Sequence, residues 1–230
     1  METVSMQIIA KMHSDFPTKF GIPRQSGLAE ALTSRIVFAP EFRNADTLRG
    51  IEGFSHLWLI WEFSESVGKP WSPTVRPPRL GGNTRMGVFA TRSPFRPNPI
   101  ALSSVKLAGI EKTAEFGTVL KIRGADLMDG TPIYDIKPYL PFTDSHPEAK
   151  GGFAQEQNET TPPLQVTIPE ELKRLLGKER TKALEGVLAA DPRPHYQNDP
   201  TRTYAMEFAG IEIKFSIKEN TVFVHHPDAG

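Results

Sequence analysis

Short apolar runs separated by turn residues fill most of the N-terminal half of the chain. They are rich in β-branched and aromatic side chains and end at Gly, Pro, Asn or Asp, which is typical of β-strands. They cover residues 6–12, 34–40, 56–63, 86–92, 103–110 and 117–127. Between them, no run of about ten residues repeats its apolar positions with helical spacing. Strands without intervening helices predict a β-barrel or strongly curved sheet, not a parallel sheet of the Rossmann type.

The pattern changes near residue 150. Residues 145–163 are polar and almost free of large apolar side chains, which indicates a linker or long surface loop. Leucine and valine then recur at three-and-four spacing over 172–188, which predicts an amphipathic helix pair or one broken helix. From Ile211 the tail alternates apolar and polar positions, which predicts a β-hairpin. We therefore expect a mainly β protein with a barrel over 1–147, a linker over 148–163 and a small α+β domain over 164–230.

Composition excludes several classes of protein. The 230 residues include 38% hydrophobic residues, enough for a real core. There is no long apolar run and no secretory signal pattern, so we expect no membrane association. The absence of Cys fits a cytoplasmic protein and, with no paired His spacing, argues against a bound metal. No dinucleotide glycine fingerprint, phosphate-binding loop or nucleophile elbow is present.

The charge distribution is uneven although the totals are equal, at 27 basic and 27 acidic residues. Between Ser66 and Ile110 there is no acidic residue. The basic residues of this acid-free region are Lys69, Arg76, Arg79, Arg85, Arg92, Arg96 and Lys106. Like charges among Gly and Pro turns repel one another unless an anion binds, and a nucleic acid backbone is the simplest such partner. Phe89 and Phe95 lie between the arginines; either could stack a base, but we expect Phe89 to pack in the core.

Two polar clusters leave their roles open. Asp126, Asp129 and Asp135 stand close together among tight turns, where a carboxylate could bind a ligand hydroxyl or amino group, or only cap the turns. The segment DPRPHY begins at Asp191, directly after the helical stretch. It could serve proton transfer or RNA contact, or it could be a proline-rich helix stop.

Together, the sequence motifs resemble a known family. Five motifs follow one another in this chain as in the bacterial TrmO (TsaA-like) family, from about residue 5 to about residue 225. They are PRQSG, GFSHLWLIW, the long arginine-rich motif WSPTVRPPRLGGNTRMGVFATRSPFRPNPIALS, DLMDGTPIYDIKPYLPF and DPRPHY. The resemblance implies a β-barrel that binds S-adenosylmethionine without a Rossmann sheet, usually as a homodimer. It implies methylation of N6 of N6-threonylcarbamoyladenosine beside the anticodon of threonine tRNAs.

The resemblance also implies positions for the site. It places the cofactor at Gln25, Ser26, Gly27, Phe63, Ser64, Arg92, Leu127, Met128, Asp129 and Gly130. Many relatives carry His where this chain has Ser64. We expect Arg92 to meet the cofactor carboxylate, and Asp129 to meet its ribose or amino group.

The substrate side is predicted from chemistry. If a general base is used, Asp191 and Tyr196 are the candidates. The anionic threonyl group and the tRNA would be bound from among Arg76, Arg79, Arg85, Arg96 and Arg193. The competing interpretations are a non-catalytic RNA-binding module and a small-molecule methyltransferase on the same barrel.

Overall fold

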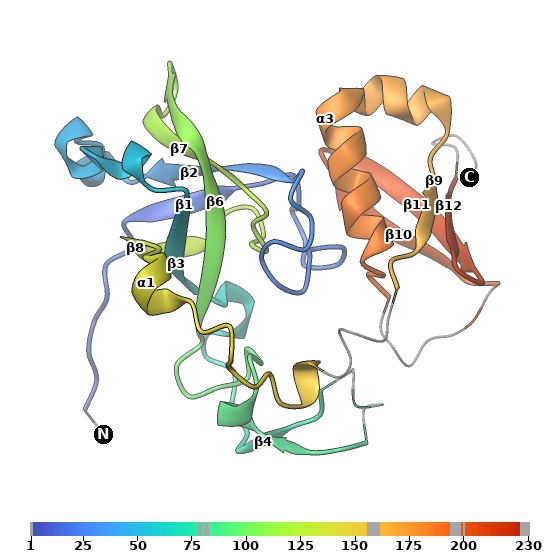
Figure 1. Ribbon diagram of the computed structural model, residues 1–230, viewed down its shortest axis with the longest axis horizontal. Coiled ribbons are helices and arrows are strands. Elements are labelled where there is room, and N and C mark those ends of the chain that lie inside the picture. The colour runs from blue at the N-terminus through green and yellow to red at the C-terminus, as the bar shows by residue number, and fades with distance from the viewer. Residues whose placement is uncertain are drawn as a thin grey trace.

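The computed structural model describes residues 2–77, 80, 83–155, 162–193, 199 and 201–225. Figure 1 shows two bodies, a strand-rich N-terminal half and a smaller C-terminal half in which α3 packs beside a sheet. Strands outnumber helices throughout the described chain, so the prediction of a mainly β protein is confirmed. No described helix is both long and apolar enough to cross a membrane.

The N-terminal half is built on antiparallel strands that form a cycle. In the described chain, each strand in the order β1-β2-β7-β6-β3-β8 pairs with the next, and β8 pairs with β1, which closes a barrel. The bounds are β1 Ala10–His13, β2 Thr33–Phe38, β3 His56–Glu62, β6 Ile100–Thr113, β7 Gly117–Arg123 and β8 Pro132–Pro138. Leu57, Leu59 and Trp61 of β3 alternate into the barrel core, as strand periodicity requires. The apolar runs had not indicated β8, whose burial does not alternate.

The segment between β3 and β6, here called the arginine-rich region, forms one short pair of strands in its described residues. β4 (Thr74–Val75) pairs with β5 (Met86–Gly87), and a 3₁₀ turn then covers Val88–Ala90. Val88 is buried, whereas the Phe89 side chain is 77% exposed. The expectation that Phe89 packs in the core is therefore wrong, because the chain turns after Gly87 and does not continue as a strand.

Short helices complete the N-terminal half. Further 3₁₀ turns cover Pro40–Phe42, Ala45–Leu48, Ile51–Gly53 and Ser64–Ser66. The helix α1, Pro141–Asp144, is one turn long. Trp58 on the outer face of β3 donates its Nε1–H to Asp144 at 2.8 Å. This bond fixes the chain where it leaves the barrel.

The C-terminal half is a sheet covered by one broken helix. The sheet order is β10 (Thr203–Phe208), β11 (Ile211–Lys218), β12 (Thr221–Val224) and β9 (Gln165–Thr167). In the described residues only the β9–β12 pair is parallel. α3 spans Glu170–Ala189 and breaks at Gly177, whose φ of 72° lies in the left-handed region that glycine tolerates. The predictions of a broken helix and of a hairpin from Ile211 are both confirmed.

A segment of the N-terminal half completes the C-terminal core. Phe16, Ala29 and Leu32, from the connection between β1 and β2, are buried together with the apolar faces of α3 and its sheet. A Cβ atom placed on Gly186 of α3 would lie only 3.6 Å from the Ala29 Cβ. The connection between β1 and β2 is therefore packed against both halves, which matters because it carries the first predicted cofactor segment.

Candidate functional site

Two glycines bring the Gln25–Gly27 segment onto the end of β7. The Gly27 N–H donates to the Gly124 carbonyl at 2.8 Å, and the Gly124 N–H donates to Leu32 at 2.9 Å. Gly27 and Gly124 have φ values of +84° and +72°, and a Cβ on Gly124 would lie 3.3 Å from the Gly27 Cα and N atoms. Glycine is required at Gly124 by both its backbone angle and its space. We call Arg24–Gly27 the Gln25 loop.

The half-buried carboxyl of Asp126 lies next to this loop. The Trp61 Nε1–H donates to Ser103 Oγ at 2.9 Å, and the Ser103 hydroxyl donates to Asp126 Oδ1 at 2.6 Å. Burial raises the pKa of Asp126, although hydrogen bonds from Ser103 and from the Ser26 backbone act against this shift. Sequence reasoning had named Asp126 only as one of three clustered acids, and nothing in the apolar pattern indicated its connection to Ser103 and Trp61.

Arg92 reaches the same place from the arginine-rich region. Its guanidinium donates to Gln25 Oε1. Its positive charge also acts against the upward shift that burial causes in the pKa of Asp126. Gln25, Ser26 and Arg92 are therefore brought together with Asp126 from three separate parts of the chain. A guanidinium and a carboxyl held side by side suit a zwitterionic ligand, which carries one carboxylate and one ammonium group.

The turn from Leu127 to Gly130 follows directly and is tied to β1. The Ser14 hydroxyl donates to the Leu127 carbonyl at 3.1 Å, and the Gly130 N–H donates to Met12 at 2.8 Å. The Leu127 side chain is buried in the barrel core, so only its backbone is available to a ligand. Met128 is half-buried, and the Thr131 N–H donates to its carbonyl at 3.2 Å.

Asp129 has a capping role of its own. Its Oδ1 accepts a hydrogen bond from the Ser14 backbone N–H at 3.0 Å, and its N–H donates to Phe16 at 2.7 Å. The turn-capping interpretation of Asp129 therefore has direct support. The side chain is also exposed, so the same carboxylate can face a ligand.

Phe63 and Ser64 lie immediately beyond β3. The Phe63 N–H donates to Pro99 at 2.8 Å, and its ring meets Trp61 edge-on with centroids 4.7 Å apart. Trp61 in turn holds Ser103. Phe63 is thus packed next to the hydrogen-bonded chain that ends at Asp126, while Ser64 begins the following 3₁₀ turn.

The other arginines differ in how far they are engaged. Arg96 is half-buried and donates to the carbonyls of Thr91 at 3.0 Å and Ser93 at 3.3 Å, so it fixes its own loop. Arg85 is exposed and donates to Thr74 Oγ1 at 3.0 Å, and Arg76 is exposed beside β4. Arg79 lies outside the described residues. Arg76 and Arg85 are therefore the described arginines of this group that are open to solvent.

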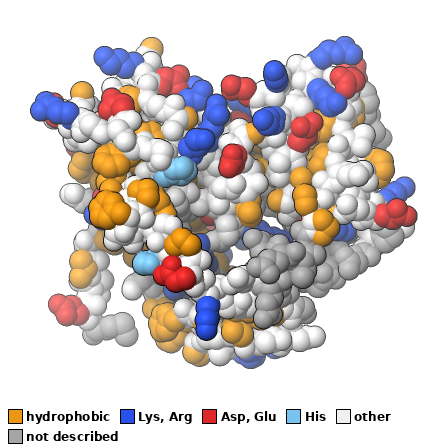
Figure 2. Space-filling model, in the orientation of Figure 1, with side chains coloured by type: hydrophobic (Ala, Val, Ile, Leu, Met, Phe, Trp, Pro, Cys, Tyr) orange, Lys and Arg blue, Asp and Glu red, His pale blue; other side chains and the backbone are white. Residues whose placement is uncertain are grey.

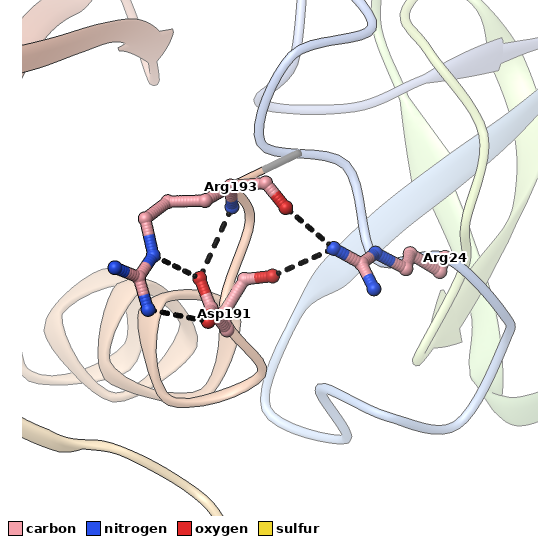
Figure 3. A network of polar contacts seen from close by, with 3 residues as sticks. All are labelled: Arg24, Asp191 and Arg193. Carbon is pink, nitrogen blue, oxygen red and sulfur yellow. Dashed lines mark hydrogen bonds and ion pairs between the residues drawn. The ribbon is translucent and has the colours of Figure 1, made fainter. Parts of the chain in front are cut away.

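The DPRPHY segment reaches back to the Gln25 loop (Figure 3). Arg193 pairs with Asp191 through Nε–Oδ1 at 2.9 Å and Nη2–Oδ2 at 2.8 Å. Burial alone would raise the pKa of Asp191, but the hydrogen bonds and charge of Arg193 outweigh it and the pKa is lowered. A carboxylate held in this way is a poor proton acceptor, and a guanidinium so engaged is less available to an external anion. Tyr196 lies outside the described residues.

The cavity between β1, β2 and α3 is a separate feature. It measures about 540 Å³, and Asp129 at its edge is the predicted site residue that borders it. Its charged side chains carry both signs, with Arg35, Lys121 and Arg180 near Asp15 and Glu179. Figure 2 shows Lys and Arg mixed with Asp and Glu on this face. Within the described chain no cluster of His, Asp or Glu is arranged to hold a metal ion.

The fold and sequence match known proteins over nearly their whole lengths. The tRNA-methyltransferase O (TrmO) N-terminal domain matches residues 11–145, and the TrmO C-terminal domain matches residues 161–227. The tRNA (adenine(37)-N6)-methyltransferase of Escherichia coli (strain K12) is 40% identical over 226 residues, 95% of each chain. That of Eikenella corrodens is 47% identical over 172 residues, covering 74% of this chain and 95% of its own.

A solved structure gives the same result. The crystal structure of TrmO from Pseudomonas aeruginosa is 31% identical with a TM-score of 0.76, covering 97% of this chain and 98% of its own. Both halves of the chain and the connection between them are therefore shared with that protein. This chain belongs to the TrmO family.

Proposed function

We propose that this protein is an S-adenosylmethionine-dependent tRNA methyltransferase that modifies N6 of adenine 37 in threonine tRNAs carrying the threonylcarbamoyl group. The observation that carries the proposal is the family match over both halves, with relatives named tRNA (adenine(37)-N6)-methyltransferase. A relative from Pseudomonas aeruginosa, 38% identical over 219 residues, is named as an S-adenosylmethionine-dependent methyltransferase. The protein is accordingly a methyltransferase with that cofactor.

The residues gathered at the end of β7 fit the cofactor. Gly27 and Gly124 let two backbones meet without side chains, which leaves room beside them for a flat adenine and a ribose. We assign the methionine carboxylate to Arg92, and the ammonium or ribose hydroxyls to Asp129. When bound, the cofactor supplies an electrophilic methyl group. Phe63, packed edge-on against Trp61, shields the site from water.

Methyl transfer to this nitrogen requires alignment of the nitrogen with the methyl group more than it requires a strong base. The target nitrogen lies in a urea-like linkage and is more acidic than an ordinary exocyclic amine, so positioning and water exclusion dominate. Because Asp191 is paired with Arg193, Tyr196 is the remaining candidate if a general base is used. The exposed Arg76 and Arg85, together with Arg79, are the proposed contacts to the tRNA backbone and to the threonyl carboxylate.

We further propose a homodimer that acts in the cytoplasm. Ile100 and Leu102 on the outer face of β6 are 37% and 52% exposed, which supports an interface between copies. Light scattering in solution tests this: the mass of a monomer at micromolar concentration would refute the dimer.

The deciding experiment supplies labelled S-adenosylmethionine and threonine tRNA with or without the threonylcarbamoyl group, followed by mass spectrometry of the nucleosides. We expect a methyl group on threonylcarbamoyladenosine alone. Methylation of unmodified adenosine would refute the proposal that threonylcarbamoyladenosine is the substrate. Cofactor binding without methylation of either tRNA would favour a small-molecule methyltransferase, and tRNA binding without cofactor binding would favour a non-catalytic RNA-binding module.

A further inference from the structure

The Asp191–Arg193 pair builds a rigid turn at the end of α3. The side chains are 19% and 14% exposed and are joined by two parallel hydrogen bonds. A third bond, from the Arg193 N–H to Asp191 Oδ1 at 3.2 Å, closes the turn. Asp191 itself has a φ of 51°, a left-handed conformation that is uncommon for residues other than glycine. The ion pair therefore fixes the direction of the backbone after α3.

The fixed turn presents its carbonyls to the N-terminal half. The Arg24 Nη2 donates to the Asp191 carbonyl at 3.1 Å and to the Arg193 carbonyl at 2.7 Å (Figure 3). Both carbonyls belong to the C-terminal half, whereas Arg24 opens the Gln25 loop. The close-up shows the Arg24 guanidinium pointing at the turn from the opposite side of the gap between the two chain segments.

The contact continues into the proposed cofactor site. The Gln25 Nε2 donates to the Arg24 carbonyl at 2.5 Å, and Gln25 Oε1 accepts from Arg92. Arg24 and Gln25 thus link Asp191 in one half to Arg92 in the other, each residue being hydrogen bonded to the next. A shift of Arg24 would move the backbone that carries Gln25 and Ser26.

We propose that Arg24, Asp191 and Arg193 are positioning residues for S-adenosylmethionine: the C-terminal turn holds Arg24 and thereby orders the Gln25 loop for the cofactor. This inference rests on the proposed cofactor role of the Gln25 loop. It gives the C-terminal half a part in cofactor affinity, in addition to its proposed place on the substrate side.

The test measures S-adenosylmethionine binding to the full chain by calorimetry, without tRNA. Arg24→Ala and Arg193→Ala should each weaken binding about tenfold, since each removes charge-assisted or buried hydrogen bonds. The double variant should lose little more than either single one, because both act through one network. In turnover assays the KM for the cofactor should rise while kcat at saturating cofactor is retained.

Arg180→Ala is the matched control. Arg180 also joins α3 to the N-terminal half, through an ion pair with Asp15 at 3.0 Å, but it does not touch the Gln25 loop. Its removal should leave cofactor affinity within about twofold, as for an exposed ion pair. If Arg193→Ala fails to fold, Arg193→Lys replaces it, because lysine keeps the charge but cannot form the paired bonds.

The outcomes separate the two proposals. Wild-type affinity in the Arg24 and Arg193 variants, or an equal loss in Arg180→Ala, would overturn the positioning role alone. Failure of the wild-type protein to bind S-adenosylmethionine would instead overturn the cofactor assignment on which this inference rests.

Discussion

Ser103→Ala tests whether Ser103 stabilises the ionised form of the half-buried Asp126 carboxyl next to the Gln25 loop. Ser103 is 2% exposed and stands between the Trp61 indole and Asp126, accepting from one and donating to the other. The substitution removes a single oxygen and leaves little space, so packing changes hardly contribute. Its effect is therefore that of two hydrogen bonds.

The magnitude can be worked out for each bond. Loss of a hydrogen bond to an ionised carboxylate costs about 1.5–3 kcal/mol, and a buried indole N–H left without an acceptor costs about 1–3 kcal/mol. Near pH 7 we expect the sum, a loss of about 2.5–6 kcal/mol in the free energy of unfolding. In acid, where Asp126 is protonated, the part of this loss that comes from the hydrogen bond to the carboxylate should disappear. The part that comes from the unpaired indole N–H, about 1–3 kcal/mol, should remain.

The sign follows from the direction of the pKa shift. Burial raises the pKa of Asp126 above its ordinary value of 3.8. Its contribution to stability is therefore fully present below pH 3.8 and is lost as pH rises through the pKa of the folded protein. Ser103 limits this loss by hydrogen bonding to the ionised form. Without Ser103 the folded pKa rises further, so the variant should lose more stability than the wild type on passing from acid to neutral pH.

Urea unfolding of both proteins at about pH 3 and pH 7 measures the difference. Ser104→Ala, the next residue on β6 and only half-buried, is the control and should change stability by less than about 0.5 kcal/mol. An equal loss for Ser103→Ala at the two pH values would show that Ser103 does not stabilise the ionised carboxylate. The reasoning about Asp126 would then be refuted.

Two further predictions concern glycines. Gly124→Ala should weaken S-adenosylmethionine binding at least about tenfold in calorimetry. The reason is that its Cβ would lie 3.3 Å from the Gly27 backbone, at a residue whose φ is +72°. Unchanged affinity would show that the Gln25 loop does not bind the cofactor. In α3, Gly177→Ala should cost about 1–2 kcal/mol in denaturant unfolding because Gly177 has a φ of +72°. Gly186→Ala, whose Cβ meets Ala29 at an ordinary 3.6 Å, should instead stabilise by up to about 1 kcal/mol. Equal effects of these two substitutions would contradict the assignment of the helix break to Gly177.

The parts of the fold that follow from local periodicity could be predicted from the sequence. The alternation from Ile211 and the three-and-four spacing through α3 report which side of each element is buried, and both elements form as expected. β8 could not be found in this way, because its residues are buried at the start and exposed at the end, without alternation. Phe89 was misplaced because a turn, not a strand, follows Gly87.

The candidate site could be predicted only as separate pieces. Motifs named Gln25, Arg92 and the turn after Leu127, but their meeting depends on long-range contacts such as Gly27 with Gly124. Ser103 is the last residue of the long arginine-rich motif, but the motif gave it no role, because that role depends on Trp61 and Asp126 lying on either side of it. Pairing between distant segments is a property of the folded barrel, and periodicity along the chain does not encode it.

The same dependence explains why the two halves act together. The connection between β1 and β2 contributes Phe16, Ala29 and Leu32 to the C-terminal core, and between these positions it carries the Gln25 loop. Its apolar side chains are therefore buried against one half while Gly27 hydrogen bonds to the other. A loop held at both sides has lost most of its conformational freedom before any ligand arrives, which reduces the entropy that binding must oppose. If the turn at Asp191 positions the Gln25 loop as proposed, the C-terminal half contributes to cofactor affinity through this packing and this turn.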